Sequence, residues 1–297
     1  MGGSVAAFRP NAALTSGALA RLVAGLTHRQ AAEVADPSAP VTIAQLDARL
    51  VRALGLAGPA ASLTGAARAA GMAPPSRFGR EVAARLLGLR FNHPASEDNL
   101  ELRPGDAATR ADAAYSAARI LGFSGYEVPG VKEAAASIAL PPLDVWQRRV
   151  LGTAAHFIGY PYVWGGTSES TQKLFGITSR GGFDCSGFVW RVFKLQSYTG
   201  GRSLSGVFRG RGAGDMSGEV PRALRIPFAH LEPGDVLFFG AHARKSRPSE
   251  VNHTGVYVGG GWMIQSSGQG VALAPLAGWY RQRFAWARRP LSEAGLI

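Results

Sequence analysis

The stretch Gly181-Gly182-Phe183-Asp184-Cys185-Ser186-Gly187-Phe188-Val189 decides the fold that we expect for the second half of this 297-residue chain. Residues 181–184 have the composition of a loop. The apolar residues that follow recur at the spacing of a single helix face, and they are Phe188, Val189, Val192 and Phe193. The pattern predicts a helix that begins at or next to Cys185.

Cys185 is the only cysteine in the sequence, and a place on the first turn of a helix favours a reactive thiol. Unpaired backbone N–H groups and the positive end of the helix dipole stabilise a thiolate, and the same amides can donate to an oxyanion. The alternative is a small buried apolar residue, which is the usual role of a free cysteine. A single cysteine excludes an internal disulfide, and no motif has zinc-ligand spacing, so we expect no metal and no cofactor.

A cysteine nucleophile needs a base, and His253 is the candidate. It begins a strand-turn-strand pattern in which Gly259-Gly260-Gly261 supplies the turn. A hairpin centred on residue 259 would place His253 and Gln265 directly opposite each other, on one face of the sheet. The Gln265 amide oxygen could then accept the imidazole N–H and fix the tautomer that faces the thiol.

Five sequence blocks around this pair carry a family resemblance. They are Pro161-Tyr162-Val163-Trp164-Gly165-Gly166, Phe183-Asp184-Cys185-Ser186-Gly187-Phe188-Val189, Val220-Pro221-Arg222, Leu231-Glu232-Pro233-Gly234-Asp235-Val236-Leu237-Phe238-Phe239 and His253-Thr254-Gly255-Val256-Tyr257-Val258-Gly259. In this order they resemble the NlpC/P60 cysteine peptidases, a papain-like family that cuts bacterial cell-wall peptides. The resemblance spans about residues 144–290.

The resemblance implies an α+β fold, in which an antiparallel sheet of the papain-like domain packs on helices. Short β-type runs between glycines and prolines agree with it, at 236–239, 255–258, 262–264, 271–273 and 284–286. The site roles that it implies are nucleophile for Cys185, general base for His253, orienting polar residue for Gln265, cleft lining near the oxyanion for Tyr162, and binding of the free amino end of the peptide for Asp184 and Ser186. Gln265 departs from the family's more usual histidine, and residues 167–180 resemble an insertion that borders the cleft.

Three segments of the first half share one layout, in which a proline precedes a threonine by five residues and apolar residues follow at helical spacing. The pairs are Pro10 and Thr15, Pro37 and Thr42, and Pro104 and Thr109. Proline fixes an extended entry, threonine caps the first turn, and the apolar stripe packs on a neighbour. A fourth, degenerate copy starts at Pro74. The layout predicts a mostly α-helical repeat domain.

The sequence Thr109-Arg110-Ala111-Asp112 is similar to the signature of S-layer homology repeats, which form helical bundles that hold proteins on secondary cell-wall polymers. The alternative is an unrelated helical domain with capped helices. Residues 126–143 contain glycines and prolines that indicate a linker. We therefore expect a helical anchoring domain at 5–125, a linker at 126–143 and a peptidase domain at 144–297.

The net charge of +12 is concentrated in the second half, where 18 basic side chains face 9 acidic ones, against 14 and 11 in residues 1–143. Such a surface favours a polyanion, and an anionic wall polymer agrees with both resemblances. No clustered run of bases indicates a nucleic-acid partner, and no apolar run reaches the roughly 18 residues of a transmembrane segment. The N-terminus lacks a signal-peptide pattern, whereas the resemblances imply an extracellular or wall-associated protein.

The function that these observations predict is that of a bacterial cell-wall hydrolase. The resemblance implies cleavage of the peptidoglycan stem peptide between D-glutamate, through its γ-carboxyl, and diaminopimelate. Two alternatives stay open, namely an amidase or acyltransferase that uses the same Cys-His pair, and a wall-binding protein whose catalytic half is inert. The intact pair of Cys185 and His253 argues against the second alternative.

Overall fold

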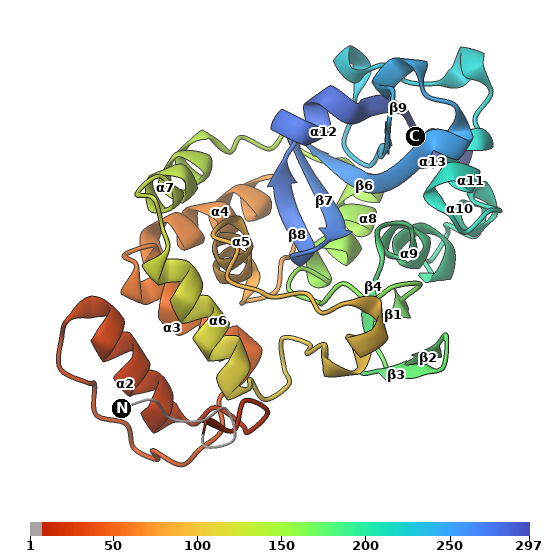
Figure 1. The fold of residues 1–297 in the computed structure, drawn as a ribbon. Coiled ribbons are helices and arrows are strands. Elements are labelled where there is room, and N and C mark those ends of the chain that lie inside the picture. Colours follow the sequence, from red (N-terminus) through yellow and green to blue (C-terminus); the bar gives the residue numbers. More distant parts are fainter. Residues whose placement is uncertain (1–7) are drawn as a thin grey trace.

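The computed structural model describes residues 8–297, so residues 5–7 of the predicted repeat domain lie outside the described part. The first half is helical, as predicted, and mixed helix and sheet structure follows (Figure 1). The helical half contains α2 (Ser16–Thr27), α3 (Ile43–Ala53), α4 (Ala57–Ala69), α5 (Phe78–Leu86), η1 (Ala95–Leu100), α6 (Arg110–Leu121) and α7 (Glu127–Ser137). Within residues 8–297, every helix is too short or too polar to cross a membrane.

The three proline–threonine segments join in a closed ring of backbone hydrogen bonds. Each segment donates to the next, from Leu14 N to Ala108 O at 2.7 Å, from Ala108 N to Val41 O at 2.9 Å, and from Val41 N to Leu14 O at 3.0 Å. The residue two places after each threonine also donates to the proline carbonyl of a neighbouring segment, in the pairs Gly17 to Pro37, Ala44 to Pro104 and Ala111 to Pro10. The three segments are therefore equivalent copies in a cyclic, approximately threefold arrangement.

Threonine caps the helix of each of these copies, as predicted. Thr15 accepts a hydrogen bond from the Ala18 N–H at the start of α2. Thr42 and Thr109 cap α3 and α6, and each forms a reciprocal capping box with the residue three places on. The fourth, degenerate copy differs, because α5 begins after Arg77 and has no side-chain cap.

The second half is built on a five-stranded antiparallel sheet in the order β8-β7-β6-β5-β9. The strands are β5 (Val236–Gly240), β6 (Val251–Gly259), β7 (Trp262–Ser267), β8 (Gly270–Pro275) and β9 (Phe284–Arg288), and each contains one of the predicted β-type runs. Helices α8 (Val145–His156) and α9 (Cys185–Trp190) pack on the face that carries Val236 and Phe238, while Leu237 and Phe239 point to the other face. The predicted α+β fold class is confirmed.

The predicted linker at 126–143 is wrong in its middle part, because residues 127–137 form helix α7. Val131 and Ala135 of this helix are buried in the protein core. Pro129 lies in the first turn, where a helix needs no backbone N–H donor, so a proline does not prevent helix formation there. Glycine and proline composition alone therefore overstated the flexibility of this segment.

One apolar core joins the two halves of the chain. Leu63 and Phe78 from α4 and α5 pack in the same cluster as Phe157 and Phe183 from the second half. Hydrogen bonds cross the same boundary, from Arg77 Nε to Ile158 O at 3.3 Å and from Leu143 N to Ala70 O at 3.1 Å. The helical half is thus packed on the sheet-containing half rather than connected to it by a free tether.

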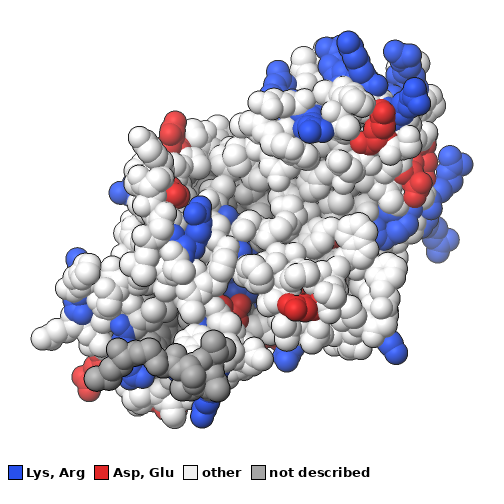
Figure 2. Space-filling model, in the orientation of Figure 1, with Lys and Arg blue, Asp and Glu red and all other residues white. Residues whose placement is uncertain are grey.

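Basic side chains are distributed unevenly on the surface. On the face in Figure 2, Lys and Arg gather at the upper end of the molecule, which Figure 1 assigns to the C-terminal half. The uneven distribution agrees with the excess of basic residues that the sequence places in residues 144–297.

Candidate active site

Cys185 begins helix α9, as predicted, directly after strand β4 (Gly182–Phe183) and Asp184. Asp184 is the N-cap of α9, and its side chain accepts a hydrogen bond from the Gly187 N–H. Phe188 and Val189 on the far side of the helix are fully buried, which fixes the helix on the sheet. Cys185 itself is half-buried.

The Cys185 thiol lies against strand β6, which carries His253. The backbone N–H groups of Thr254, the residue after His253, and of Ser186 lie close enough to the sulfur to lower the pKa of the thiol. Helix α9 packs directly on β6 and β7. The fold therefore brings the predicted nucleophile to the strand of the predicted base.

Burial keeps both groups neutral at pH 7. It raises the pKa of the Cys185 thiol to about 11, together with the charge of Asp184, while the two backbone amides and Arg211 oppose the shift. It lowers the pKa of His253 to about 4, while the nearby Gln265 amide opposes the shift. The helix start does favour the thiolate, as the sequence indicates, but its effect is smaller than that of burial. His253 is thus an unprotonated imidazole that can accept the thiol proton.

Aromatic rings account for the burial of His253. The ring centroids of Phe239, Tyr280 and Trp279 lie 5.6, 5.8 and 6.2 Å from the imidazole centroid. Trp279 belongs to helix α12 (Gly278–Arg283) and is 47% exposed, so it separates the imidazole from solvent. Sequence reasoning missed Trp279 and Tyr280, because no motif shows that α12 folds back over β5 and β6.

The hairpin register differs from the predicted one. Gly255, not His253, pairs with Gln265, because an irregularity lies between Tyr257 and Gly259 and the turn is tight. The glycines 259–261 all have positive φ, which favours glycine at this turn. His253 remains on the same face as Gln265, since it lies two residues along β6 from Gly255.

Gln265 is 2% exposed, and its amide has a fixed direction. Gln265 Nε2 donates to Ser267 Oγ at 3.1 Å, which leaves Oε1 as the atom available to the imidazole. The Gln265 amide lies close enough to His253 to raise the pKa of the imidazole. His253 Nε2 and Gln265 Oε1 are both buried, and neither has a hydrogen-bond partner among residues 8–297. An orienting role for Gln265 agrees with this geometry.

Tyr162 lies near the start of α9, because its neighbours Pro161 and Val163 both hydrogen-bond to the backbone of Phe183. Burial raises the pKa of its phenol, and the charges of Cys185, Asp184 and Asp98 act in the same direction. Because the side chain is half-buried, part of it is open to a ligand.

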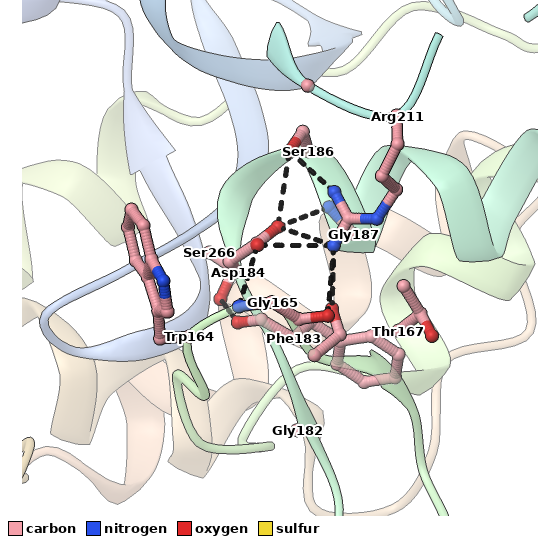
Figure 3. Close-up of polar contacts among 12 residues, drawn as sticks. Trp164, Gly165, Thr167, Gly182, Phe183, Asp184, Ser186, Gly187, Arg211 and Ser266 are labelled. Atoms are coloured by element: carbon pink, nitrogen blue, oxygen red, sulfur yellow. Dashed lines mark hydrogen bonds and ion pairs between the residues drawn. The ribbon is translucent and has the colours of Figure 1, made fainter. Parts of the chain in front are cut away.

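Asp184 and Ser186 are held in a network with Arg211, which Figure 3 shows. Arg211 Nη2 donates to both Asp184 oxygens at 3.0 and 3.1 Å, and Nη1 donates to Ser186 Oγ at 2.6 Å. Asp184 also accepts from the Gly165 N–H at 2.9 Å. The Arg211 guanidinium thus neutralises the charge of the Asp184 carboxylate, which the sequence analysis expected to bind the free amino end of the peptide.

Sequence reasoning missed Arg211, because residues 209–214 are rich in glycine and indicate only a loop. In the structure, this loop delivers the arginine to the carbonyl oxygens of Gly165 and Gly166 as well as to Asp184. Binding of an amino end by Asp184 and Ser186 stays a prediction, and in this structure both side chains bind Arg211.

A thiol at a helix start, next to a strand that carries an imidazole and with a buried amide on the following strand, is typical of papain-like cysteine peptidases. Residues 159–289 match the NlpC/P60 family, and the C-terminal half of the chain therefore contains an NlpC/P60 family domain. The predicted family of this half is confirmed.

Similar proteins include peptidases of bacteria. The chain is 32% identical over 147 residues to the gamma-D-glutamyl-L-lysine dipeptidyl-peptidase of Bacillus subtilis (strain 168). The aligned region is 48% of this chain and 41% of that protein. It is 35% identical over 142 residues to the murein DD-endopeptidase MepH of Escherichia coli (strain K12), and the aligned region is 47% of this chain and 44% of that protein. A crystal structure of an NlpC/P60 family protein from Bacillus cereus is 29% identical and covers 49% of this chain and 40% of that chain, with a TM-score of 0.37. The chain thus spans less than half the length of these relatives.

Proposed function

We propose that this protein is a cell-wall hydrolase whose C-terminal half, residues 144–297, is a cysteine endopeptidase for peptidoglycan stem peptides. The observation that carries the proposal is the placement of the half-buried Cys185 thiol against strand β6, beside His253, in a domain of the NlpC/P60 family. The names of the relatives, which include a dipeptidyl-peptidase and a murein endopeptidase, support the same class of reaction.

In this proposal, Cys185 Sγ attacks the scissile carbonyl carbon while His253 accepts the thiol proton. The oxyanion that forms accepts hydrogen bonds from backbone amides at the start of α9, with Tyr162 beside them. His253 then returns the proton to the departing amine, which leaves a thioester on Cys185. Water, deprotonated by His253, hydrolyses the thioester and restores the thiol. Gln265 acts as a positioning residue, because it holds the imidazole in one orientation throughout.

We propose the bond between the γ-carboxyl of D-glutamate and diaminopimelate as the one that is cut. The relative with 32% identity is named for hydrolysis at a γ-D-glutamyl bond, which supports this choice. The murein DD-endopeptidase is named for a different bond, so the choice needs a direct test.

We propose further that residues 5–125 hold the enzyme on an anionic polymer of the cell wall, outside the cytoplasm, as S-layer homology repeats do. The support is the cyclic arrangement of three equivalent proline–threonine copies, in which each copy bonds to the next through Leu14, Val41 and Ala108. A threefold unit presents equivalent segments three times, and such repetition suits a repeating polymer. The excess of basic residues in the second half would strengthen wall binding.

Digestion of purified peptidoglycan by the full chain, followed by mass analysis of the products, tests the proposal. Stem peptides cut between D-glutamate and diaminopimelate are the expected products. Release of intact stem peptides from the sugar chain would indicate an amidase, transfer of an acyl group to a second substrate would indicate an acyltransferase, and binding without products would indicate an inert wall-binding protein.

A further inference from the structure

Three hollows join into one groove on the surface of the helical half. The first, of about 350 Å³, lies among α3, α4 and α5, and the second, of about 450 Å³, lies among the start of α2, α3 and α5. The third, of about 320 Å³, lies between the ends of α2 and α3. Arg52 lines all three hollows, while Arg80 lines the first two and Arg49 the last two. Helix α3 thus forms one continuous wall of the groove.

The charged side chains that line this groove are all arginines. They are exposed, no aspartate or glutamate lies among them, and they are Arg29, Arg49, Arg52, Arg68 and Arg80. Within residues 8–297, none of the five forms an ion pair, and their guanidinium groups make one hydrogen bond, from Arg80 Nη2 to Ser76 O at 2.9 Å. We call this surface the arginine groove.

The acidic residues of the same helices face the interior instead. Asp47 of α3 and Glu81 of α5 are 0% and 1% exposed, and Glu81 pairs with the buried Arg85 at 3.4 Å. The carboxylates therefore lie inside the helical half, where they cannot neutralise the arginines on its surface. Neighbouring guanidinium groups repel one another, so an unpaired set of five favours the binding of an anion.

The arginine groove is separate from the signature residue that resembles S-layer homology repeats. The position of Arg110, directly after the capping threonine, is occupied by Ser16 and Ile43 in the other two copies. Arg110 itself donates from Nε to the Phe8 carbonyl at 2.7 Å, and its guanidinium lies 5.0 Å from the centroid of the Phe8 ring. The three copies are therefore equivalent in backbone but not in charge, which points to one anion site instead of three.

The lining narrows the class of anion. A guanidinium group binds phosphate or carboxylate through two parallel hydrogen bonds. Arg49 and Arg52 are three residues apart on one face of α3, so a chain with closely spaced charges can contact both. No aromatic side chain of residues 8–297 lines the groove, so the stacking that binds the bases of single-stranded nucleic acids has no platform there. The lining favours a flexible, charged chain without rings to stack.

We propose that the arginine groove binds a linear chain of phosphate diesters joined by polyols, as the anionic wall polymer that holds the enzyme. The proposal rests on the anchoring role proposed for residues 5–125, and it specifies the surface, the ligand class and one site per chain. Phosphate diesters carry one negative charge per repeat unit, so successive phosphates can pair with Arg52 and with the arginines on either side of it.

The test measures binding of the full chain to poly(glycerol phosphate) by calorimetry at several salt concentrations. Each arginine–phosphate contact contributes about one to the slope of log K against log salt. The combined variant Arg49→Gln, Arg52→Gln and Arg80→Gln should therefore reduce the slope by about three. It should also weaken binding by roughly tenfold or more at low salt.

The combined variant Arg9→Gln, Arg21→Gln and Arg119→Gln is the matched control, because it removes the same charge from exposed arginines of the same half outside the groove. It should change the slope by less than about one. Both variants should keep the wild-type thermal midpoint, since all six side chains are exposed. Both should also cleave short soluble stem peptides at the wild-type rate, because the arginine groove lies outside the active site.

The outcomes separate the arginine groove from the proposed function. If wild-type protein binds the polymer and the groove variant keeps its affinity and slope, or the control loses as much, the groove is overturned while an anchoring role stands. Tighter binding of polygalacturonate or of oligothymidylate at equal charge would overturn the phosphate–polyol class in favour of a polycarboxylate or a nucleic acid. If wild-type protein binds neither the polymers nor intact cell walls, the anchoring role fails and the groove fails with it.

Discussion

The helical half and the active site are assembled in different ways. The helical half is made of short copies, each with its own proline, threonine cap and apolar stripe, which then join through backbone hydrogen bonds such as Leu14 N to Ala108 O. The active site has no repeating local unit, because Cys185, His253 and Gln265 come from α9, β6 and β7 and meet only when the sheet forms. Local signals therefore predict elements well in both halves, whereas the contacts between elements require the structure.

The same comparison shows that the halves are not independent. Phe78 of α5 and Phe183 before α9 belong to one apolar core, and Asp98 of η1 accepts a hydrogen bond from the Trp164 N–H. A helical unit that served only as an anchor would need none of these contacts. The boundary between the halves is thus a packed interface that supports the site, and the predictions below test each side of it.

The largest effect is expected from Cys185→Ala. Loss of the nucleophile should lower turnover of stem peptides by more than about a thousandfold, since losing a catalytic nucleophile typically costs far more than that. The thermal midpoint should change little, because the substitution removes one sulfur atom from a half-buried position. Release of peptide products by wild-type and variant protein, measured by chromatography, provides the check. Turnover of the variant above this level would rule out covalent catalysis by Cys185.

The second effect concerns the shared core. Phe78→Ala should lower the free energy of unfolding by about 3–5 kcal/mol, because the side chain is 1% exposed and its removal leaves a cavity. Peptidase activity should be lost at the same lower temperature as helical structure, because the core spans both halves. Phe91→Ala is the matched control, since Phe91 is 45% exposed, and should change stability by less than about 1 kcal/mol. Two separate melting transitions, with activity following only the unaffected one, would contradict a shared cooperative core.

Sequence reasoning reached the elements that local chemistry determines. The start of α9 at Cys185, the caps at Thr42 and Thr109 and the five strands all follow from short patterns of apolar spacing, capping residues and glycine. Helix α7 was missed, because Pro129 and Gly130 indicate a loop unless the proline is known to lie in a first helical turn.

Contacts between distant segments were beyond the reach of sequence reasoning. The hairpin register depends on an irregularity near Gly259 that periodicity does not show. Arg211 and Asp98 lie in segments with no catalytic pattern, and each reaches its partner, Asp184 or Trp164, only through tertiary packing. The resemblance to NlpC/P60 peptidases supplied Cys185 and His253 as candidate catalytic residues. It assigned Asp184 a ligand role but did not indicate the ion pair of Asp184 with Arg211.

A smaller effect is expected at Gln265. Gln265→Ala should lower kcat/KM by roughly tenfold to a hundredfold, less than loss of the base itself, because the imidazole remains but loses its orienting partner. Gln265→His should restore much of the rate. The Gln265 amide raises the pKa of His253, so its removal should move the acid limb of the pH–rate profile to lower pH. If both variants kept the wild-type rate and the wild-type acid limb, Gln265 would have no role in the active site. Gln30→Ala, at an exposed glutamine, is the control.

The smallest effect concerns the three threonine caps, which test whether the copies of the ring are equivalent in energy. Thr42→Ala and Thr109→Ala should each lower the free energy of unfolding by about 1 kcal/mol or more, because each removes one half of a reciprocal capping box. Thr15→Ala should cost less, since Thr15 accepts a single bond at 3.3 Å and has no reciprocal partner. Chemical denaturation of the three single variants measures the order. Equal losses would show that the backbone ring, rather than the capping boxes, determines the stability of each copy, whereas a larger loss at Thr15 would contradict the capping argument.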